Sequence, residues 1–127
     1  VVHSDGSDEI RLDAPTHVVE LKNGAITEYD ISPSDLGLEP RTDADLTGIV
    51  ANSAESSLAL VRQSLNDDSS AAADIVAVNA GAAIYVSGVA NSLLNGVEMA
   101  QDAISSGQAK ERLAELVRIT SLMSESS

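Results

Sequence analysis

Two adjacent carboxylates near the start of the chain are the side chains best suited to chemistry. Asp8 and Glu9 end a short polar loop that contains one glycine, and the apolar pair Val1 and Val2 precedes that loop. Carboxylate oxygens suit Mg²⁺, which uses few protein ligands and fills its other positions with water or substrate phosphates. The same acids also fit an ordinary solvated loop, because the chain carries 20 acidic residues. Asp8 and Glu9 are therefore the candidate metal ligands.

Histidine offers a second possibility. His3 falls on the predicted strand before the loop, where it could be a general base, although a histidine without a patterned partner is more often structural. His17 lies in a predicted hairpin strand and is expected to face solvent. Ser4 and Asp5 could orient the loop through hydrogen bonds to its backbone. The sequence contains no phosphate-binding glycine motif, zinc-spaced histidines or serine nucleophile elbow. We therefore assign no catalytic residue and expect only part of a metal site.

Composition restricts the partners. The formal net charge is −13 at pH 7, and an acidic surface repels phosphate backbones and anionic membranes. Aromatic residues make up 2% of the chain, too few for stacking on single-stranded nucleic acid. Cysteine is absent, which excludes disulfides and thiolate chemistry. Residues 71–86 are apolar but contain Asp74 and Asn79, and they fall short of the roughly 18 apolar residues of a spanning helix. We expect a cytoplasmic protein with no nucleic-acid or membrane partner.

Strands are expected to position the loop. Residues 1–4 are typical of the end of a strand. Residues 9–12 predict a further short strand, with Ile10 and Leu12 on one face. Pro15 then ends or bends this segment.

A hairpin follows. Residues 16–22 and 25–31 are strand-like runs on either side of the dipeptide Asn23–Gly24. This dipeptide favours a type I′ turn, because both central residues need positive φ. Val19 and Leu21 alternate with polar neighbours, which is typical of one face of a strand.

The second half of the chain predicts helices. Before it, Ser32, Pro33 and Gly37 are typical of the cap, first residue and end of a single helical turn. A short helix is expected around residues 43–46. Four longer helices are expected at residues 53–66, 71–87, 91–106 and 108–120.

Apolar spacing predicts how these helices pack. In the first long helix, Ala54, Leu58, Val61 and Leu65 fall on one stripe that we expect to be buried. The polar segment 66–70 separates it from the second helix. That second helix is apolar on nearly all sides, so we expect it to be central, and its small residues permit close approach.

The ordered motifs resemble the anthranilate phosphoribosyltransferase family. The C-terminal half of that family commonly reads VVHG/S and DGLDE, similar to residues 1–10 here. A strand pair around an Asn-Gly or Asp-Gly turn and a PEDFGL-like turn correspond to residues 18–31 and 33–38. Segments similar to LNAAAALYVAG and GVALAREAIDSGAA are residues 78–88 and 96–109. Each motif is weak alone, whereas the ordered set is specific and covers nearly the whole chain.

The resemblance implies an α/β fold. The chain would be the C-terminal part of the nucleoside phosphorylase/phosphoribosyltransferase-type α/β domain, a β-hairpin region followed by about four helices. Residues 1–122 would form this portion, strand- and hairpin-rich over 1–38 and helical over 52–122. Because the end of the chain is rich in serine, we expect a disordered tail at 123–127. Ser7 stands where the family usually has an apolar residue, which could loosen packing under the loop.

The resemblance also implies a chemistry. Enzymes of the family are glycosyltransferases that move phosphoribosyl from phosphoribosyl pyrophosphate to anthranilate in tryptophan biosynthesis, with Mg²⁺ neutralising the leaving pyrophosphate. Asp8 and Glu9 would hold that Mg²⁺. The missing N-terminal part of the same protein would supply the phosphate loop and the substrate-binding residues, which are unknown in this chain. The full-length enzyme would be a homodimer, and the fragment alone would be inactive.

Two other interpretations stay open. One is a paralogue of the same fold, either nucleoside-phosphorylase-like or a non-catalytic nucleic-acid binder. The acidic charge disfavours the binder, and the Asp8–Glu9 pair favours phosphoribosyl chemistry over phosphorolysis. The other is a stand-alone acidic interaction module, which a start in mid-strand without Met disfavours.

Overall fold

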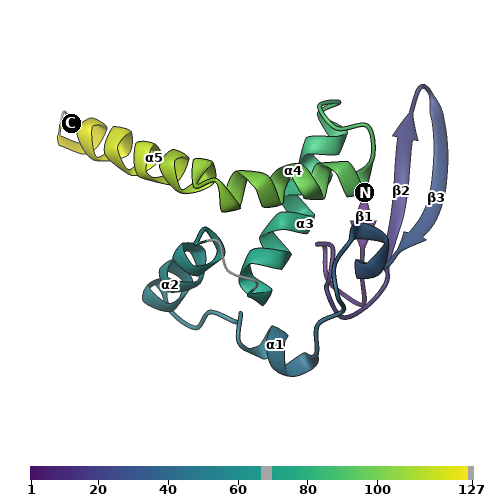
Figure 1. Ribbon diagram of the computed structural model, residues 1–127, viewed down its shortest axis with the longest axis horizontal. Helices are drawn as coiled ribbons and strands as arrows, with labels where there is room; N and C mark the ends of the chain where they lie inside the picture. The colour runs from purple at the N-terminus through teal and green to yellow at the C-terminus, as the bar shows by residue number, and fades with distance from the viewer. Residues whose placement is uncertain (67–69, 126–127) are drawn as a thin grey trace.

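A small antiparallel sheet forms one side of the molecule (Figure 1). The computed structural model describes residues 1–66 and 70–125. Strands β2 (Thr16–Lys22) and β3 (Ala25–Ile31) form a hairpin, and β1 (Val2–His3) pairs with β2 in the order β1-β2-β3. The φ angles of Asn23 and Gly24 are 53° and 79°, as a type I′ turn requires. The predicted strand end and hairpin are therefore confirmed.

The buried face of the hairpin is not the one marked by Val19 and Leu21. Thr16 and Val18 are buried instead, whereas Leu21 is 72% exposed. The pairing Thr16↔Ile31 puts the even-numbered face of β2 on the same side as Ile31 of the core. Each face of β2 carries both apolar and polar side chains, so the pattern of the strand alone could not choose the buried face.

Residues 9–12 form no strand, which corrects the prediction for this segment. Ile10 and Leu12 are nevertheless deeply buried, at 2% and 0% exposed. The Ile10 N–H and C=O groups bond to the side-chain amide of Asn79 rather than to a neighbouring strand. Ile10 and Leu12 are thus core residues without being strand residues, and the Asn79 amide pairs with the Ile10 backbone groups that a neighbouring strand was expected to bond.

Helices follow in the expected order. Ser32 and Gly37 bound the single turn after the hairpin, and Gly37 adopts a φ of 75°. Ser53, Ser70 and Ser92 cap the next long helices, each accepting a backbone N–H from the first turn. The elements are η1 (Pro33–Leu36), α1 (Asp43–Thr47), α2 (Ala54–Ser64), α3 (Ala71–Val86), α4 (Leu93–Ser105) and α5 (Gln108–Glu125). Within the described ranges, no helix is long and apolar enough to cross a membrane.

Two expectations about the helices need correction. The apolar stripe of α2 is not buried, since Leu58 and Val61 are 46% and 41% exposed, and the helix packs against α3 with Ser64 as its buried residue. Helix α5 continues to Glu125, into the predicted tail. The Ser124 hydroxyl donates to the Ser121 carbonyl, so serine is accommodated within the helix. Residues 67–69 of the predicted polar break, and 126–127 of the tail, lie outside the described residues.

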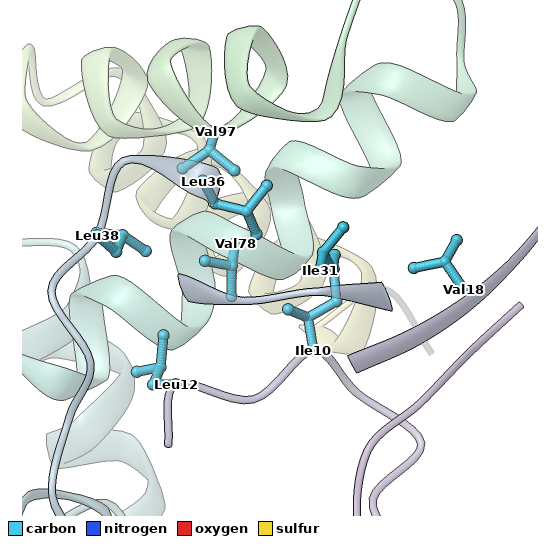
Figure 2. Close-up of a cluster of buried hydrophobic side chains, with 8 residues drawn as sticks. All are labelled: Ile10, Leu12, Val18, Ile31, Leu36, Leu38, Val78 and Val97. Carbon is cyan, nitrogen blue, oxygen red and sulfur yellow. The ribbon is translucent and has the colours of Figure 1, made fainter. Parts of the chain in front are cut away.

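Helix α3 is central, as its all-round apolar character predicted. Apolar side chains from the hairpin, the residues around η1, and helices α3 and α4 converge on it (Figure 2). The buried cluster consists of Ile10, Leu12, Val18, Ile31, Leu36, Leu38, Val78 and Val97.

Glycine allows α3 and α4 to approach closely. A Cβ added to Gly81 would lie 2.6 Å from the Val97 Cα, and one added to Gly96 would overlap the Gly81 carbonyl oxygen. The two backbones are therefore in direct contact. A core without Phe or Trp gains its contacts by bringing backbones together rather than by filling space with large side chains.

The substitution Gly96→Ala tests this contact. Alanine favours a helix over glycine by about 1 kcal/mol, so any loss of stability reports the steric overlap. We expect the free energy of unfolding to fall by about 1–3 kcal/mol, measured by urea unfolding of the purified chain. Glu98→Ala, at an exposed position of α4, serves as the control and should leave the urea midpoint nearly unchanged. A Gly96→Ala midpoint at or above that of the unsubstituted chain would contradict the close contact.

Candidate functional site

The loop that carries Asp8 and Glu9 begins with a closed turn. Ser4 and Ser7 exchange backbone hydrogen bonds at 3.0 and 2.8 Å. Between them, the dipeptide Asp5–Gly6 adopts φ angles of 42° and 82°. This is the positive-φ turn chemistry that Asn23–Gly24 uses in the hairpin. Asp5 therefore acts as a turn residue.

Hydrogen bonds of two serine hydroxyls stabilise the turn. Ser4 is buried, and its Oγ donates to the Pro15 carbonyl at 2.7 Å. The Ser7 Oγ accepts from the Glu9 N–H at 3.2 Å. Ser7 therefore makes a polar contact with the loop backbone.

The far end of the loop is fixed by Asn79 on α3. Its Oδ1 accepts from the Ile10 N–H at 3.0 Å, and its Nδ2 donates to the Ile10 carbonyl at 3.1 Å. This contact was not predicted from the sequence. Its one signal was an amide in the middle of an otherwise apolar helix.

The carboxylates of Asp8 and Glu9 are both exposed. In the described part of the chain, no cluster of three or more His, Cys, Asp or Glu side chains could hold a metal ion. Two carboxylates at the surface fit Mg²⁺ that takes its other ligands from water and phosphate oxygens, and they do not fit a cage built wholly of protein ligands.

The histidines lie on the sheet. His3 and His17 are cross-strand partners on β1 and β2. The His17 Nδ1 is 2.8 Å from Asp30 Oδ1, and its Nε2 is 3.7 Å from Glu28 Oε2. His17 is half-exposed in these contacts, as expected. His3 is exposed as well, so the structure gives it no buried environment that would mark a general base.

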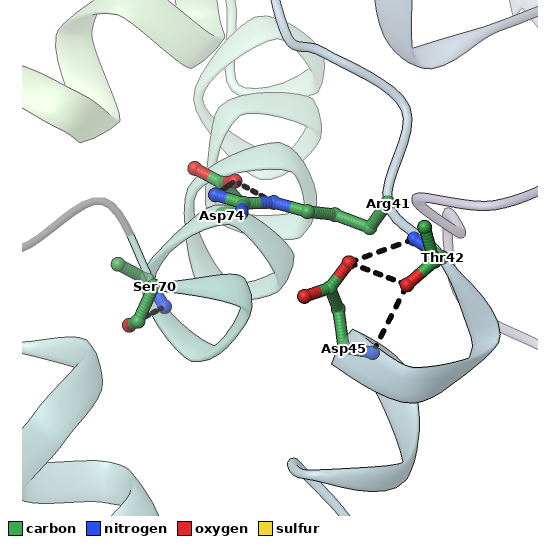
Figure 3. Close-up of polar contacts among 6 residues, drawn as sticks. Arg41, Thr42, Asp45, Ser70 and Asp74 are labelled. Carbon is green, nitrogen blue, oxygen red and sulfur yellow. Dashed lines mark hydrogen bonds and ion pairs between the residues drawn. The ribbon is translucent and has the colours of Figure 1, made fainter.

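Arginine side chains support the segment that follows the loop. The backbone N–H of Arg41 donates to the Leu12 carbonyl at 2.9 Å. The side-chain Nε of Arg41 donates to the Asp74 carboxylate on α3 at 2.8 Å (Figure 3). A hydrogen bond from Arg11 holds the pKa of Asp13 below its usual range. The segment that leaves the loop is thus tied to the central helix a second time.

A second polar cluster joins the hairpin to the C-terminal end of α3. The Glu20 carboxylate accepts from Tyr85 OH at 2.6 Å and from Tyr29 OH at 3.0 Å. Lys22 donates to Tyr85 OH at 2.9 Å and lies over its ring. The hydrogen bond from Tyr85 lowers the pKa of Glu20. Burial, with the bond to Glu20, raises the pKa of Tyr29 to about 12.

This cluster lines a cavity of about 560 Å³ between the sheet and the end of α3. Apolar side chains such as Val2, Val18 and Leu93 form much of its wall, and neither Asp8 nor Glu9 reaches it. The cluster was not predicted from the sequence, although Tyr29 and Tyr85 are the only Phe, Tyr or Trp residues of the chain. We assign the cluster a structural role in joining hairpin and helix.

Comparison with known proteins places these features in a family. The family described as "Glycosyl transferase family, a/b domain" matches residues 1–110. The chain belongs to this family, and the predicted α/β fold is confirmed.

Several relatives carry the same name. Anthranilate phosphoribosyltransferase of Teredinibacter turnerae is 48% identical over 126 residues, which are 96% of this chain and 36% of the relative. The enzyme of that name from Marinomonas sp. is 53% identical over 94% of this chain and 35% of its own length. The crystal structure of anthranilate phosphoribosyltransferase from Thermus thermophilus superposes with a TM-score of 0.80 at 33% identity, over 92% of this chain and 34% of that one. The resemblance seen in the motifs is thus confirmed, and the chain spans about a third of the length of these relatives.

The Tyr29 environment gives a prediction about alkaline stability. The folded-state pKa of about 12 lies above the ordinary value of about 10. Folding therefore favours the protonated phenol, and this stabilisation is complete below about pH 10 and is lost as pH rises toward 12. We expect Tyr29→Phe to lose less stability than the unsubstituted chain between about pH 10 and pH 12, measured as urea midpoints. Parallel pH profiles for the two proteins would contradict the assigned environment.

Proposed function

We propose that the chain is the Mg²⁺-binding portion of an anthranilate phosphoribosyltransferase. The reaction joins the anthranilate amine nitrogen to C1 of the ribose in phosphoribosyl pyrophosphate. The bond from C1 to the pyrophosphate oxygen breaks, and the amine loses a proton. The observation that carries this proposal is the fastened loop with Asp8 and Glu9, in a chain whose relatives are named for this activity.

Each part of the site has a separate task in this proposal. Asp8 and Glu9 supply carboxylate oxygens from a loop fixed at both ends, so their backbone needs little reorganisation when a cation arrives. Mg²⁺, when bound, neutralises charge on the pyrophosphate. The sequence has no glycine-rich phosphate loop. In a protein as long as the relatives, the two thirds outside this chain would therefore bind phosphoribosyl pyrophosphate and anthranilate.

The same proposal includes the setting of the reaction. We place the activity in tryptophan biosynthesis in the cytoplasm, in an enzyme that is a homodimer when complete. The names of the relatives favour this function over a nucleoside phosphorylase or a stand-alone interaction module.

A hybrid enzyme tests the activity. In this hybrid, the whole chain replaces the matching segment of the Teredinibacter turnerae relative, to which it is 48% identical. Loss of anthranilate fluorescence is followed in the presence of phosphoribosyl pyrophosphate, with and without Mg²⁺. We expect consumption that depends on Mg²⁺. A folded hybrid that leaves anthranilate unconsumed would contradict the proposal.

The paired substitution Asp8→Asn with Glu9→Gln tests the metal ligands in the same hybrid. We expect activity to fall by about 100-fold, because a bound metal contributes several kcal/mol and each 1.4 kcal/mol is a factor of ten. The melting temperature should stay the same, since both side chains are exposed.

A matched control separates the site from the overall charge. Glu98→Gln with Asp102→Asn removes the same two charges from exposed positions on α4, and it should retain full activity. If the activities of the two paired variants depended equally on Mg²⁺, the assignment of Asp8 and Glu9 as metal ligands would be wrong.

A further inference from the structure

We infer that Asn79 is a positioning residue, whose side-chain amide holds the backbone beside Glu9 in place for metal binding. Because the Mg²⁺ site belongs to the proposed function, the role of Asn79 rests on that function too. Asn79 bonds to the backbone of Ile10, the residue after Glu9, and Ile10 and Asn79 are 69 positions apart in the chain.

Asn79 uses both donors of its side-chain amide and accepts one hydrogen bond at its oxygen. The Oδ1 accepts from the Ile10 N–H at 3.0 Å, and the Nδ2 donates to the Ile10 carbonyl at 3.1 Å and to the Ile75 carbonyl at 3.0 Å. The bond to Ile75 lies within α3, one turn before Asn79. Both amide protons are thereby used, so the helix itself fixes the direction in which the amide faces the loop.

The contact acts directly on Glu9. The N–H of Ile10 belongs to the peptide unit that joins Glu9 to Ile10, so Asn79 sets the orientation of that unit. The preceding unit is held as well, because the Glu9 N–H donates to Ser7 Oγ at 3.2 Å. Both peptide groups that flank the Glu9 Cα are therefore restrained.

The backbone is also restrained on both sides of the Asp8–Glu9 dipeptide. The exchange between Ser4 and Ser7 closes its start, and Ile10 is anchored in the core at 2% exposure. Asp8 and Glu9 are the two residues between these fixed points, and both are exposed. The anchors therefore hold the backbone while the carboxylates remain open to solvent.

Asparagine is chemically suited to this position. A side-chain amide offers one donor edge and one acceptor edge, which match the N–H and C=O of a single residue. An aspartate of the same size would place a second oxygen against the carbonyls of Ile10 and Ile75. Alanine would leave the Ile10 N–H and C=O without this partner.

The test uses the hybrid enzyme with Asn79→Ala and Asn79→Asp. The probe is Mn²⁺ with inorganic pyrophosphate, and binding is followed by the loss of the electron paramagnetic resonance signal of free Mn²⁺. The Mg²⁺ concentration for half-maximal activity is measured alongside. Groups that orient metal ligands typically alter metal affinity 10- to 100-fold when removed, so we expect at least about tenfold weaker binding and a matching rise in the Mg²⁺ requirement.

Ser92→Ala is the structural control. It removes the N-cap bond of α4, in which Ser92 Oγ accepts from the Asn95 N–H at 3.1 Å, and it should lower the melting temperature without altering Mn²⁺ binding. If the Asn79 variants lose thermal stability but bind Mn²⁺ as tightly as the unsubstituted hybrid, the inference is overturned and Asn79 is only structural. If Asn79→Ala does not fold, Mn²⁺ binding by the isosteric Asn79→Asp variant tests the positioning role.

The paired Asp8→Asn and Glu9→Gln variant separates this inference from the proposed function. Mn²⁺ binding that survives the loss of both carboxylates would overturn the metal site at Asp8 and Glu9 and, with it, the role of Asn79, whereas the transferase activity is tested separately by anthranilate consumption. Binding that is lost with the carboxylates but retained in the Asn79 variants would overturn the positioning role alone.

Discussion

The paired hydrogen bonds between the Asn79 amide and the Ile10 backbone connect the two halves of the molecule. Ile10 ends the carboxylate loop and begins the segment that enters the core, whereas Asn79 lies in the central helix. A segment without a strand partner would otherwise bring unpaired peptide groups into a partly buried region, which is unfavourable. The Asn79 side chain removes that cost at Ile10, and it thereby sets where the loop lies relative to α3.

This connection depends on a rigid α3, and close packing with α4 provides the rigidity. Gly81 and Gly96 bring the two backbones into contact, and alanines 71, 72, 73 and 77 are buried along the same helix. A core without Phe or Trp has few large side chains with which to fill space. Small residues solve this problem by shortening the distance between helices, so many weak dispersion contacts are made along the backbone.

Local chemistry was predictable from sequence and tertiary packing was not. Asn23–Gly24 has one strongly favoured turn, and serine before an apolar run caps a helix through a bond to its own first turn. These signals need no distant partner, and neither does the identification of Asp8 and Glu9 as exposed loop carboxylates. The contact between Asn79 and Ile10 joins residues 69 positions apart, so no periodicity within either segment reveals it.

Apolar spacing also predicted surfaces that this chain does not bury. Leu58 on α2 and Leu116 and Leu122 on α5 are exposed in the described residues, although helical periodicity marked Leu58 for burial. Amphipathic spacing indicates that one face of a helix suits an apolar environment, but that face is buried only where another surface packs against it. Helix α5 extends away from the sheet (Figure 1). Among the described residues, Ala109 at its start packs against a buried cluster, whereas Leu116 and Leu122 are 58% and 53% exposed.

Electrostatics explain why the proposed chemistry needs a cation at this loop. The chain has a formal net charge of −13, so its field repels a pyrophosphate group. Exposed carboxylates on the loop add to that repulsion when they are empty, and they turn it into attraction only when they hold a divalent ion that phosphate oxygens can share. In the proposed function, the acidic surface of this chain would therefore make pyrophosphate binding conditional on the metal. In the proposed function, restraint of the loop by Ser7 and Asn79 would serve the same end, because carboxylates on a fixed backbone would lose less conformational entropy on binding the ion.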